Sequence, residues 1–281
     1  MANLEGLLKL IRPLNCIVMS FAVLVGASLT GLGNLQWINL LFGAITAFTL
    51  TGAAMAVNDY YDYDIDRINE PNRPIPSGEV SLKASLIITA VLTLIGLSFA
   101  FIISLYCLVF ATVAWIFMVT YTTIGKRAGF PGNLLVSACV AAPFLFGSLV
   151  ATNTVAINIL LFASMAFLAN TGREIAKGIV DIEGDSQHKI KTIAAVFGGK
   201  KAALAAITFF ISAVCLSPIP LILNIVSIWF IPFVLITDVG LIWCSVSLLK
   251  NPERENSRKI KKTVLFLFIF GLLAFIFGML G

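Results

Sequence analysis

The sequence predicts an all-α membrane protein, a bundle of nine transmembrane helices that forms a single domain over residues 1–281. Two features indicate this class. Of the 281 residues, 59% are hydrophobic and only 12% are charged, whereas water-soluble chains carry about 25% charged residues. The apolar residues also gather in runs of about twenty, which is the length that a helix needs to cross a bilayer. Much of the apolar surface is therefore expected to contact lipid.

Nine apolar runs give the expected helices. The split between the third and fourth runs at Ser104 rests on length alone, and Pro218 and Pro220 part the seventh run from the eighth. The first run is too long for the apolar segment of a signal peptide, so it is expected to remain as a helix. The five cysteines lie within the runs without CxxC spacing, which is typical of small apolar core residues. The runs lie near 13–32, 37–58, 82–104, 105–125, 132–151, 156–173, 201–218, 221–249 and 262–280.

The basic residues all lie on one side of these helices. All 19 Lys and Arg residues lie before the first run or after the second, fourth, sixth and eighth runs. With nine spans, these segments share one side of the membrane, and cytoplasmic loops carry the excess of Lys and Arg. We therefore expect a cytoplasmic N-terminus, an external C-terminus and functional loops at 58–82 and 173–200 on the cytoplasmic face of a cell membrane. The net charge of +5 is then a property of a membrane surface, and no basic–aromatic repeat indicates a nucleic-acid partner.

The second apolar run ends in an acidic cluster. Asp59, Asp62 and Asp66 are spaced at i, i+3 and i+7, so a helix that continued past the membrane would place them on one face. Asn58 lies close to that face, and Asp64 lies nearly opposite. Carboxylates at this spacing suit Mg²⁺, which binds hard oxygen ligands and shares its remaining sites with substrate phosphates. The alternative is a solvated acidic loop whose charge is balanced by the arginines that follow it.

A proline-rich loop follows this cluster. Arg73 precedes Pro74, and three prolines with Gly78 stiffen residues 71–78. The residue before a proline is held in extended geometry. A guanidinium presented rigidly beside a carboxylate cluster suits the binding of a diphosphate, and a plain surface arginine is the alternative.

The sixth apolar run ends in a second polar stripe. On a helix, Asn170, Glu174, Lys177, Asp181 and Asp185 would share one face. Two carboxylates at i and i+4 indicate a second metal site, with a lysine one turn before them. The two clusters follow the second and sixth helices, four helices apart, which suggests a repeated four-helix unit.

These residues resemble the motifs of the UbiA-type intramembrane prenyltransferases. That family pairs an NDxxDxxxD motif with a later DxxxD motif, which here are Asn58-Asp59-x-x-Asp62-x-x-x-Asp66 and Asp181-x-x-x-Asp185. The resemblance covers nearly the whole chain. Three further stretches are similar to the family, namely Asn69 with Arg73-Pro74-Ile75-Pro76-Ser77-Gly78, Tyr121 with Lys126-Arg127, and Arg12-Pro13-x-Asn15.

The resemblance implies a mechanism. Two Mg²⁺ ions would bridge the acidic motifs to the diphosphate of an isoprenyl donor, whose tail would lie in a cavity open sideways to the bilayer. Loss of the diphosphate would leave an allylic carbocation, which the acceptor attacks. Metal and cationic groups stabilise the charge that builds on the leaving group, and the apolar helices exclude the water that would quench the cation.

The resemblance also implies roles for individual residues. Asn58 would assist the metal ligands, and Asn15 would line the cavity. Tyr121 would face the cation or bind a phosphate, or else be an ordinary interfacial tyrosine. The residues implied to hold metal and to be catalytic are Asp59, Asp62, Asp66, Asp181 and Asp185. The residues implied to bind substrate phosphate are Arg73, Lys126, Arg173 and Lys177, of which Lys126 is also catalytic.

The identity of the acceptor depends on the stretch before the second acidic motif. Arg173-Glu174-Ile175-x-Lys177 looks most like the archaeal members of the family, which join geranylgeranyl diphosphate to the free hydroxyl of a lipid-like acceptor, geranylgeranylglyceryl phosphate. Lys189 and Lys191 are further candidates to hold the acceptor phosphate. Gly178 departs from that subgroup, where an acid is expected. The run at 69–74 is similar to chlorophyll synthases, so chlorophyllide or an aromatic acid is the alternative acceptor.

A secondary transporter is the alternative from another class of protein. Its charged site would be expected near the bilayer midplane, whereas the acidic groups here lie at the cytoplasmic ends of the runs. Asp238 alone lies deep in a run, where it lines a substrate cavity or makes a structural hydrogen bond. His188, the only histidine, is a candidate general base, but the residues do not identify the group that deprotonates the acceptor.

Overall fold

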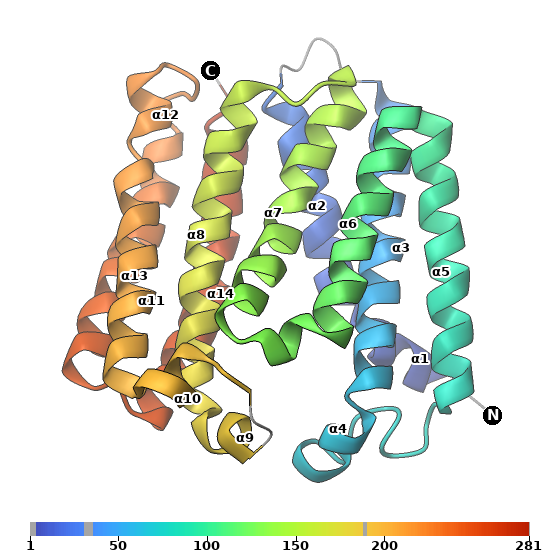
Figure 1. Ribbon diagram of the computed structural model, residues 1–281. Coiled ribbons are helices and arrows are strands. Elements are labelled where there is room, and N and C mark those ends of the chain that lie inside the picture. The colour runs from blue at the N-terminus through green and yellow to red at the C-terminus, as the bar shows by residue number, and fades with distance from the viewer. Residues whose placement is uncertain (1–3, 31–35, 188–189, 281) are drawn as a thin grey trace. The chain divides into compact units, whose positions relative to one another are not determined.

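The chain folds into helices throughout, as the sequence predicts. The computed structural model describes residues 4–30, 36–187 and 190–280, and these residues contain no β-strand. Within them, eight helices are long and apolar enough to cross a membrane (Figure 1). A ninth span results if α1 (Leu4–Ile11) and α2 (Pro13–Ser28), which meet at a 45° bend, are taken as one. The protein is therefore an all-α, multi-pass membrane protein.

The helices fall into two compact units, and each unit carries one acidic motif. Unit 1 comprises Met1–Thr123 and Pro143–Val155, and unit 2 comprises Ile124–Ala142 and Ala156–Gly281. α7 (Phe130–Thr152) contributes to both and contains Pro143. Besides α1 and α2, unit 1 holds α3 (Trp37–Tyr61), α4 (Tyr63–Asn69), α5 (Leu82–Ile103) and α6 (Leu105–Thr123). Unit 2 holds the 3-10 helix η2 (Gly125–Ala128), α8 (Ile157–Val180), α9 (Ile182–Gln187), α10 (Ile193–Phe197), α11 (Gly199–Leu216), α12 (Ile219–Ile222), α13 (Phe230–Lys250) and α14 (Arg254–Phe277).

Unit 1 is built around α3, which packs against α1, α2, α5 and α6. Its core joins side chains from five helices, among them Val23, Ala100 and Phe146. α2 and α7 approach so closely that a Cβ at Gly26 would overlap the backbone carbonyl of Phe144. Since other helices pack against α3 on several sides, the acidic motif at its end is held in a fixed position.

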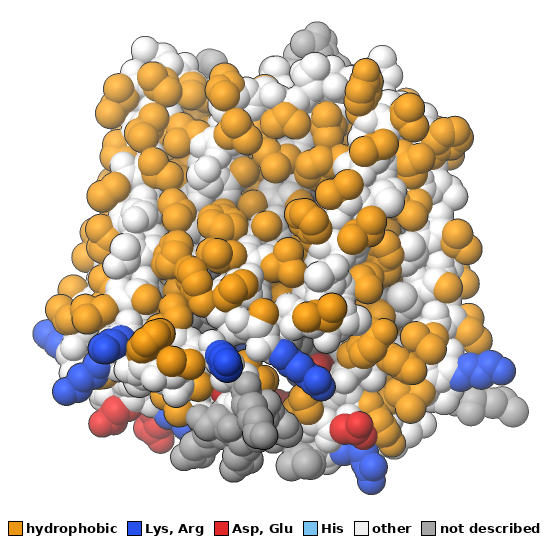
Figure 2. Space-filling model, in the orientation of Figure 1, with side chains coloured by type: hydrophobic (Ala, Val, Ile, Leu, Met, Phe, Trp, Pro, Cys, Tyr) orange, Lys and Arg blue, Asp and Glu red, His pale blue; other side chains and the backbone are white. Residues whose placement is uncertain are grey.

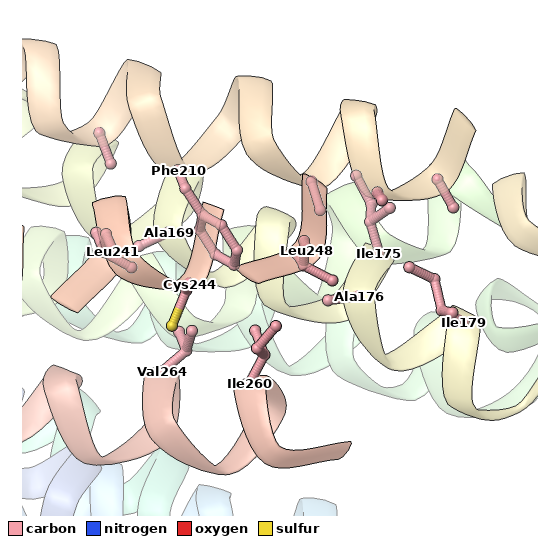
Figure 3. Packing of buried hydrophobic residues seen from close by; sticks show 14 of the residues in the cluster. Ala169, Ile175, Ala176, Ile179, Phe210, Leu241, Cys244, Leu248, Ile260 and Val264 are labelled. Carbon is pink, nitrogen blue, oxygen red and sulfur yellow. The ribbon is translucent and has the colours of Figure 1, made fainter. Parts of the chain in front are cut away.

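Unit 2 has its own core between α8, α11, α13 and α14. Figure 3 shows Ile260 and Val264 of α14 pointing toward Cys244 and Leu248 of α13, and all four side chains are fully buried. Ile175 and Ile179 of α8 and Phe210 of α11 belong to the same cluster. These contacts fix the ends of α8 and α14, which carry Arg173, Glu174, Lys177 and Lys261.

The surface divides into apolar sides and charged ends. Within each unit, the face drawn in Figure 2 shows Lys and Arg side chains gathered at one end of the helices, with hydrophobic side chains along their length. Large apolar residues such as Leu94 and Phe101 in unit 1 and Val239 in unit 2 are more than 60% exposed. Because apolar surface in water is costly, these sides are suited to lipid.

Several helix boundaries differ from the sequence prediction. The eighth span begins at Phe230 rather than at 221, because residues 223–229 form a turn in which Asn224 has a positive φ of 54° and Ser227 bonds to the end of α14. The ninth begins at Arg254 rather than at 262, because charged residues continue its helix beyond the apolar run. The sixth extends to Val180 for the same reason. The split at Ser104 is confirmed, and this residue is fully extended.

The cysteines form no disulfide, and four of the five are buried. The exception is Cys215, which is exposed on α11. The prediction of buried core residues is thus confirmed for four of them and wrong for Cys215, because its side of the helix faces outward from the unit.

Candidate active site

The first acidic motif lies where α3 gives way to α4. The helix does not continue unbroken over 59–66, because α3 ends at Tyr61 and Asp62 forms a turn before α4 begins. The backbone still makes helical bonds across the break, from Asp62 N–H to the Asn58 carbonyl at 3.0 Å and from Asp66 N–H to the Asp62 carbonyl at 2.8 Å. Asp59 and Asp66 therefore remain on the inner side, while Asp64 is exposed, as expected.

Two arginines bind the buried carboxylates of this motif. Arg12 Nη2 donates to Asp59 Oδ1 at 2.6 Å, and Arg73 Nη1 donates to Asp66 Oδ2 at 2.6 Å. The same Arg73 nitrogen also lies 3.5 Å from Asp59 Oδ1. Asp59 and Asp66 are only 1% and 4% exposed. Two nearly buried carboxylates thus converge on one positively charged nitrogen, which marks a position where a cation is stable.

Neighbouring groups orient the Asp62 carboxylate and shift the pKa of the Asp66 carboxyl. Asn58 Nδ2 donates to Asp62 Oδ2 at 3.0 Å, which orients the carboxylate in the turn. Burial raises the pKa of the Asp66 carboxyl, and the Arg73 guanidinium opposes that rise. A cation beside Asp66 therefore favours its ionised form, which is the form that binds metal.

Arg12 was not among the predicted site residues, although its Arg-Pro stretch was noted. It sits at the 45° bend between α1 and α2 with a left-handed backbone, φ 51° and ψ 70°. Such a conformation is unusual for a residue other than glycine. Pro13 begins α2 and restricts the residue before it, which is the one local signal that singles out Arg12. Its partner Asp59 is 47 residues away, so the contact itself has no local signal.

Arg73 is presented by a compact loop, as predicted. Its N–H bonds to the Glu70 carbonyl and its carbonyl accepts from Ser77 N–H, both at 2.9 Å. Val80 N–H bonds to the Pro74 carbonyl at 2.9 Å, and the Val80 side chain is fully buried. The loop thus holds the guanidinium against the motif through backbone bonds and an apolar anchor.

The second acidic motif repeats the break seen in the first. α8 ends at Val180, Asp181 forms a turn, and α9 carries Asp185. Asp185 N–H bonds to the Asp181 carbonyl at 2.8 Å. Asp185 Oδ2 accepts a bond of 3.1 Å from the hydroxyl of Thr192, which precedes α10. Asn170, expected on the polar face, is buried and donates to Ser137 of α7 at 3.1 Å.

A cluster of opposite charges lies just before Asp181. Arg173 Nη1 donates to Glu174 Oε1 at 2.6 Å, and Lys177 Nζ donates to Glu174 Oε2 at 3.3 Å. Lys261 of α14 lies close enough to interact electrostatically with these three residues and with Asp181. Glu174 is 8% exposed. Glu174 and Lys261 were not predicted as site residues, because burial of the first and proximity of the second depend on the packing of α8 against α14.

Lys126 is brought toward the second motif by the backbone of Gly129. This glycine has φ 69° and ψ −121°, a conformation that side chains disfavour. A Cβ there would overlap the carbonyl of Lys191 and lie 3.1 Å from the backbone nitrogen of Thr192. The loop that holds Lys126 in η2 therefore touches the segment whose Thr192 binds Asp185.

The remaining predicted residues lie as follows. Asn15 is exposed in the first turn of α2, and Tyr121 is partly buried near the end of α6. Lys191 is exposed. His188 and Lys189 lie outside the described residues. Asp238 accepts a 2.6 Å bond from the hydroxyl of Ser217 at the end of α11, so it makes a structural hydrogen bond.

The donor chemistry of both motifs fits Mg²⁺. Within residues 4–30, 36–187 and 190–280, no three Asp, Glu, His or Cys side chains form a complete metal cage. Mg²⁺ does not need one, since it is bound through one or two carboxylates and completes its shell with water and substrate phosphates. Asp59, Asp62 and Asp66 in unit 1 and Asp181 and Asp185 in unit 2 supply such carboxylates. The Arg73 guanidinium, a positive group, contacts both Asp59 and Asp66, which is an observation in favour of that fit.

Comparison with known proteins agrees with the geometry. The model of the UbiA prenyltransferase family matches residues 19–279. Digeranylgeranylglyceryl phosphate synthase of Methanosphaera stadtmanae is 36% identical over 255 residues, which cover 91% of this chain and 92% of the relative. A solved structure that concerns digeranylgeranylglyceryl phosphate synthase in membranes has a TM-score of 0.81 at 31% identity and covers 98% of both chains. A UbiA homologue from Archaeoglobus fulgidus, bound to GPP and Mg²⁺, shares the fold with a TM-score of 0.66 at 17% identity and covers 96% of this chain and 99% of its own.

Proposed function

Because this chain belongs to the UbiA prenyltransferase family, we propose that it transfers a geranylgeranyl group from geranylgeranyl diphosphate to geranylgeranylglyceryl phosphate. The reaction forms the second ether bond of an archaeal membrane lipid and requires Mg²⁺. The name of the Methanosphaera stadtmanae relative supports this acceptor, since 36% identity extends over 91% of the present chain. The Mg²⁺-bound homologue from Archaeoglobus fulgidus supports the metal.

One structural observation is the main support for this proposal. Asp59 and Asp66, both nearly buried, are held together by a single guanidinium nitrogen of Arg73. Such a carboxylate pair is stable only with positive charge beside it. When bound, Mg²⁺ neutralises charge on the departing diphosphate. The five motif carboxylates Asp59, Asp62, Asp66, Asp181 and Asp185 would hold the metal.

The other residues of the chain bind, orient and protect the substrates. Arg73, Lys126, Arg173 and Lys177 would bind phosphate, and Asn58 keeps the Asp62 carboxylate oriented. The donor C1–O bond breaks, and its electron pair leaves with the diphosphate. The acceptor hydroxyl oxygen forms the new bond to C1 and loses its proton. Apolar helices around the prenyl chain, with Asn15 and Tyr121 at the cavity wall, would exclude water from the allylic cation.

The proposal includes an orientation in the membrane. Every Lys and Arg lies in segments that nine spans would place on one side, and cytoplasmic loops carry such an excess. The two acidic motifs would therefore both lie on the cytoplasmic face of the cell membrane. The prenyl tail would enter from the bilayer through a lateral opening.

The test is a transfer assay on the purified protein with labelled geranylgeranyl diphosphate and Mg²⁺. Three acceptors are offered, namely geranylgeranylglyceryl phosphate, chlorophyllide and an aromatic acid. Labelling of the glyceryl phosphate alone supports the proposal. Labelling of another acceptor keeps the family chemistry but replaces the acceptor, and a protein that neither binds the donor nor labels any acceptor would favour the transporter alternative.

Variants of the motifs test the metal ligands in the same assay. Asp62→Asn and Asp181→Asn should each lower kcat by about 100-fold or more, because each removes a ligand to the ion that stabilises the leaving group. Asp64→Asn is the matched control, since Asp64 lies in the same motif but is exposed. Near-normal turnover of both ligand variants would refute the metal assignment.

A further inference from the structure

Three cations surround one buried carboxylate at the end of α8. Arg173 and Lys177 both donate to Glu174, at 2.6 and 3.3 Å. Lys261 of α14 interacts electrostatically with Glu174 and also with both of those cations. Three cations therefore share the Glu174 carboxylate at the end of α8.

The second acidic motif places one further carboxylate beside these cations. Asp181 lies next to the cluster and interacts with Lys261. In the proposed reaction, however, Asp181 would be a ligand of Mg²⁺. Like charges held close together are unfavourable, so an anion that bound beside these three cations would be stabilised by them.

Arg173 provides an independent sign of a missing acceptor. Its Nε is buried and makes no hydrogen bond within the described residues. A buried donor without a partner costs free energy, and a guanidinium is suited to bidentate contact with phosphate oxygens. The side chain is 17% exposed and that of Lys177 is 39% exposed, so a ligand can reach both.

The positions of these cations are fixed by the core of unit 2. Ile260, which precedes Lys261, is fully buried and points toward α13 in Figure 3, as does Val264 one turn later. On α8, Ile175 and Ile179 are buried in the same cluster. Because the apolar faces of α8 and α14 are packed together, the charged residues beside them are held as a preformed group.

We propose that Arg173, Lys177 and Lys261 form the binding site for the phosphomonoester of the acceptor. This inference rests on the proposed function, in which the acceptor carries a phosphate three bonds from the carbon whose hydroxyl reacts. The two substrates bring two separate anionic groups. The donor diphosphate is served by the metal ligands and by Arg73 of unit 1, and the cluster on α8 and α14 serves the second anion. A phosphate held one turn before Asp181 keeps the reacting hydroxyl near the second metal motif.

The experiment compares Lys261→Gln with Lys262→Gln. Lys262 is the next residue of the same helix, but it is exposed, and it serves as the matched control. Transfer is measured with geranylgeranylglyceryl phosphate and with the same acceptor lacking its phosphate. Loss of one charge-assisted contact should raise KM for the phosphorylated acceptor about tenfold in Lys261→Gln. KM for the dephosphorylated acceptor and for geranylgeranyl diphosphate should not change, and Lys261→Arg should restore most of the affinity.

The outcomes separate this inference from the proposed function. Transfer to neither glyceryl acceptor by the unmodified protein would refute the proposed function and the inference together. Normal transfer with equal KM values in Lys261→Gln and Lys262→Gln would refute the inference alone. A rise in KM for the donor instead of the acceptor would also overturn it, because the cluster would then bind the diphosphate. Thermal melting of each variant shows that these comparisons concern folded protein.

Discussion

Replacement of Arg12 by alanine tests the idea that the first acidic motif requires a cation. The Arg12 guanidinium lies 2.6 Å from Asp59, whose side chain is 1% exposed. Removal of this partner leaves a buried carboxylate whose remaining guanidinium contact is the longer one, at 3.5 Å to Arg73. Without Mg²⁺, the variant should therefore be less stable than the unmodified protein. With Mg²⁺, the metal should take over the missing charge.

The magnitude follows from the contact and its exposure. A hydrogen bond between charged groups contributes about 1.5–3 kcal/mol. Arg12 is 34% exposed and Arg73 remains, so we expect a loss of about 1–2 kcal/mol, which is about 2–6 °C in melting temperature for a chain of this size. Arg12→Gly should be less harmful than Arg12→Ala by about 1 kcal/mol, because glycine tolerates the left-handed backbone at this position.

The measurement is a thermal melt in detergent with and without Mg²⁺. Lys9→Ala is the control, since Lys9 lies in α1 close to Arg12 in the chain and makes exposed ion pairs with Glu5 and Glu79, which contribute little. Mg²⁺ should raise the melting temperature of Arg12→Ala more than that of the unmodified protein. The reasoning is refuted if Arg12→Ala melts like the unmodified protein without metal, or if the two gain equally from Mg²⁺.

Two further predictions concern the loop that carries Lys126 and the orientation of the chain. Gly129→Ala should destabilise the protein by about 2 kcal/mol or more and raise KM for the donor, because its Cβ would overlap the Lys191 carbonyl and displace the loop; unchanged melting and KM would contradict this. In sealed right-side-out vesicles, an impermeant maleimide should label Val155→Cys but not Ser77→Cys, both at exposed positions, in a background without native cysteines. Labelling of Ser77→Cys alone would overturn the proposed orientation.

The spans were predictable because each depends on a local quantity. A run of apolar residues of bilayer length forms a helix in lipid whatever its neighbours are. The boundaries that failed are those where charged residues continue a helix, as at Arg254 and Val180. The apolar run ends where the charged residues begin, whereas the helix continues through these charged residues. The turn before Phe230 was missed because its sequence is as apolar as the helices beside it.

The breaks at Asp62 and Asp181 were not predictable from local sequence. Neither break contains a proline or a glycine, and the helical periodicity of the carboxylates continues through both. The spacing correctly separated the buried Asp66 from the exposed Asp64, because the backbone bonds of a helix persist across the turn. The spacing of the carboxylates therefore predicted which side chains of the first motif face inward, but it did not predict the break in the helix.

The counter-ions of the motifs were the least predictable part of the site. Arg12 reaches Asp59 across 47 residues, and Lys261 reaches the Asp181 region from another helix. Both contacts depend on tertiary packing, which no local pattern encodes. They also have a common physical reason. A buried carboxylate that lacks a positive partner opposes folding. Arg12 and Arg73 in unit 1, and Arg173, Lys177 and Lys261 in unit 2, provide these charges. In the proposed reaction, metal and substrate phosphates would then bind at positions that the folded chain has already prepared.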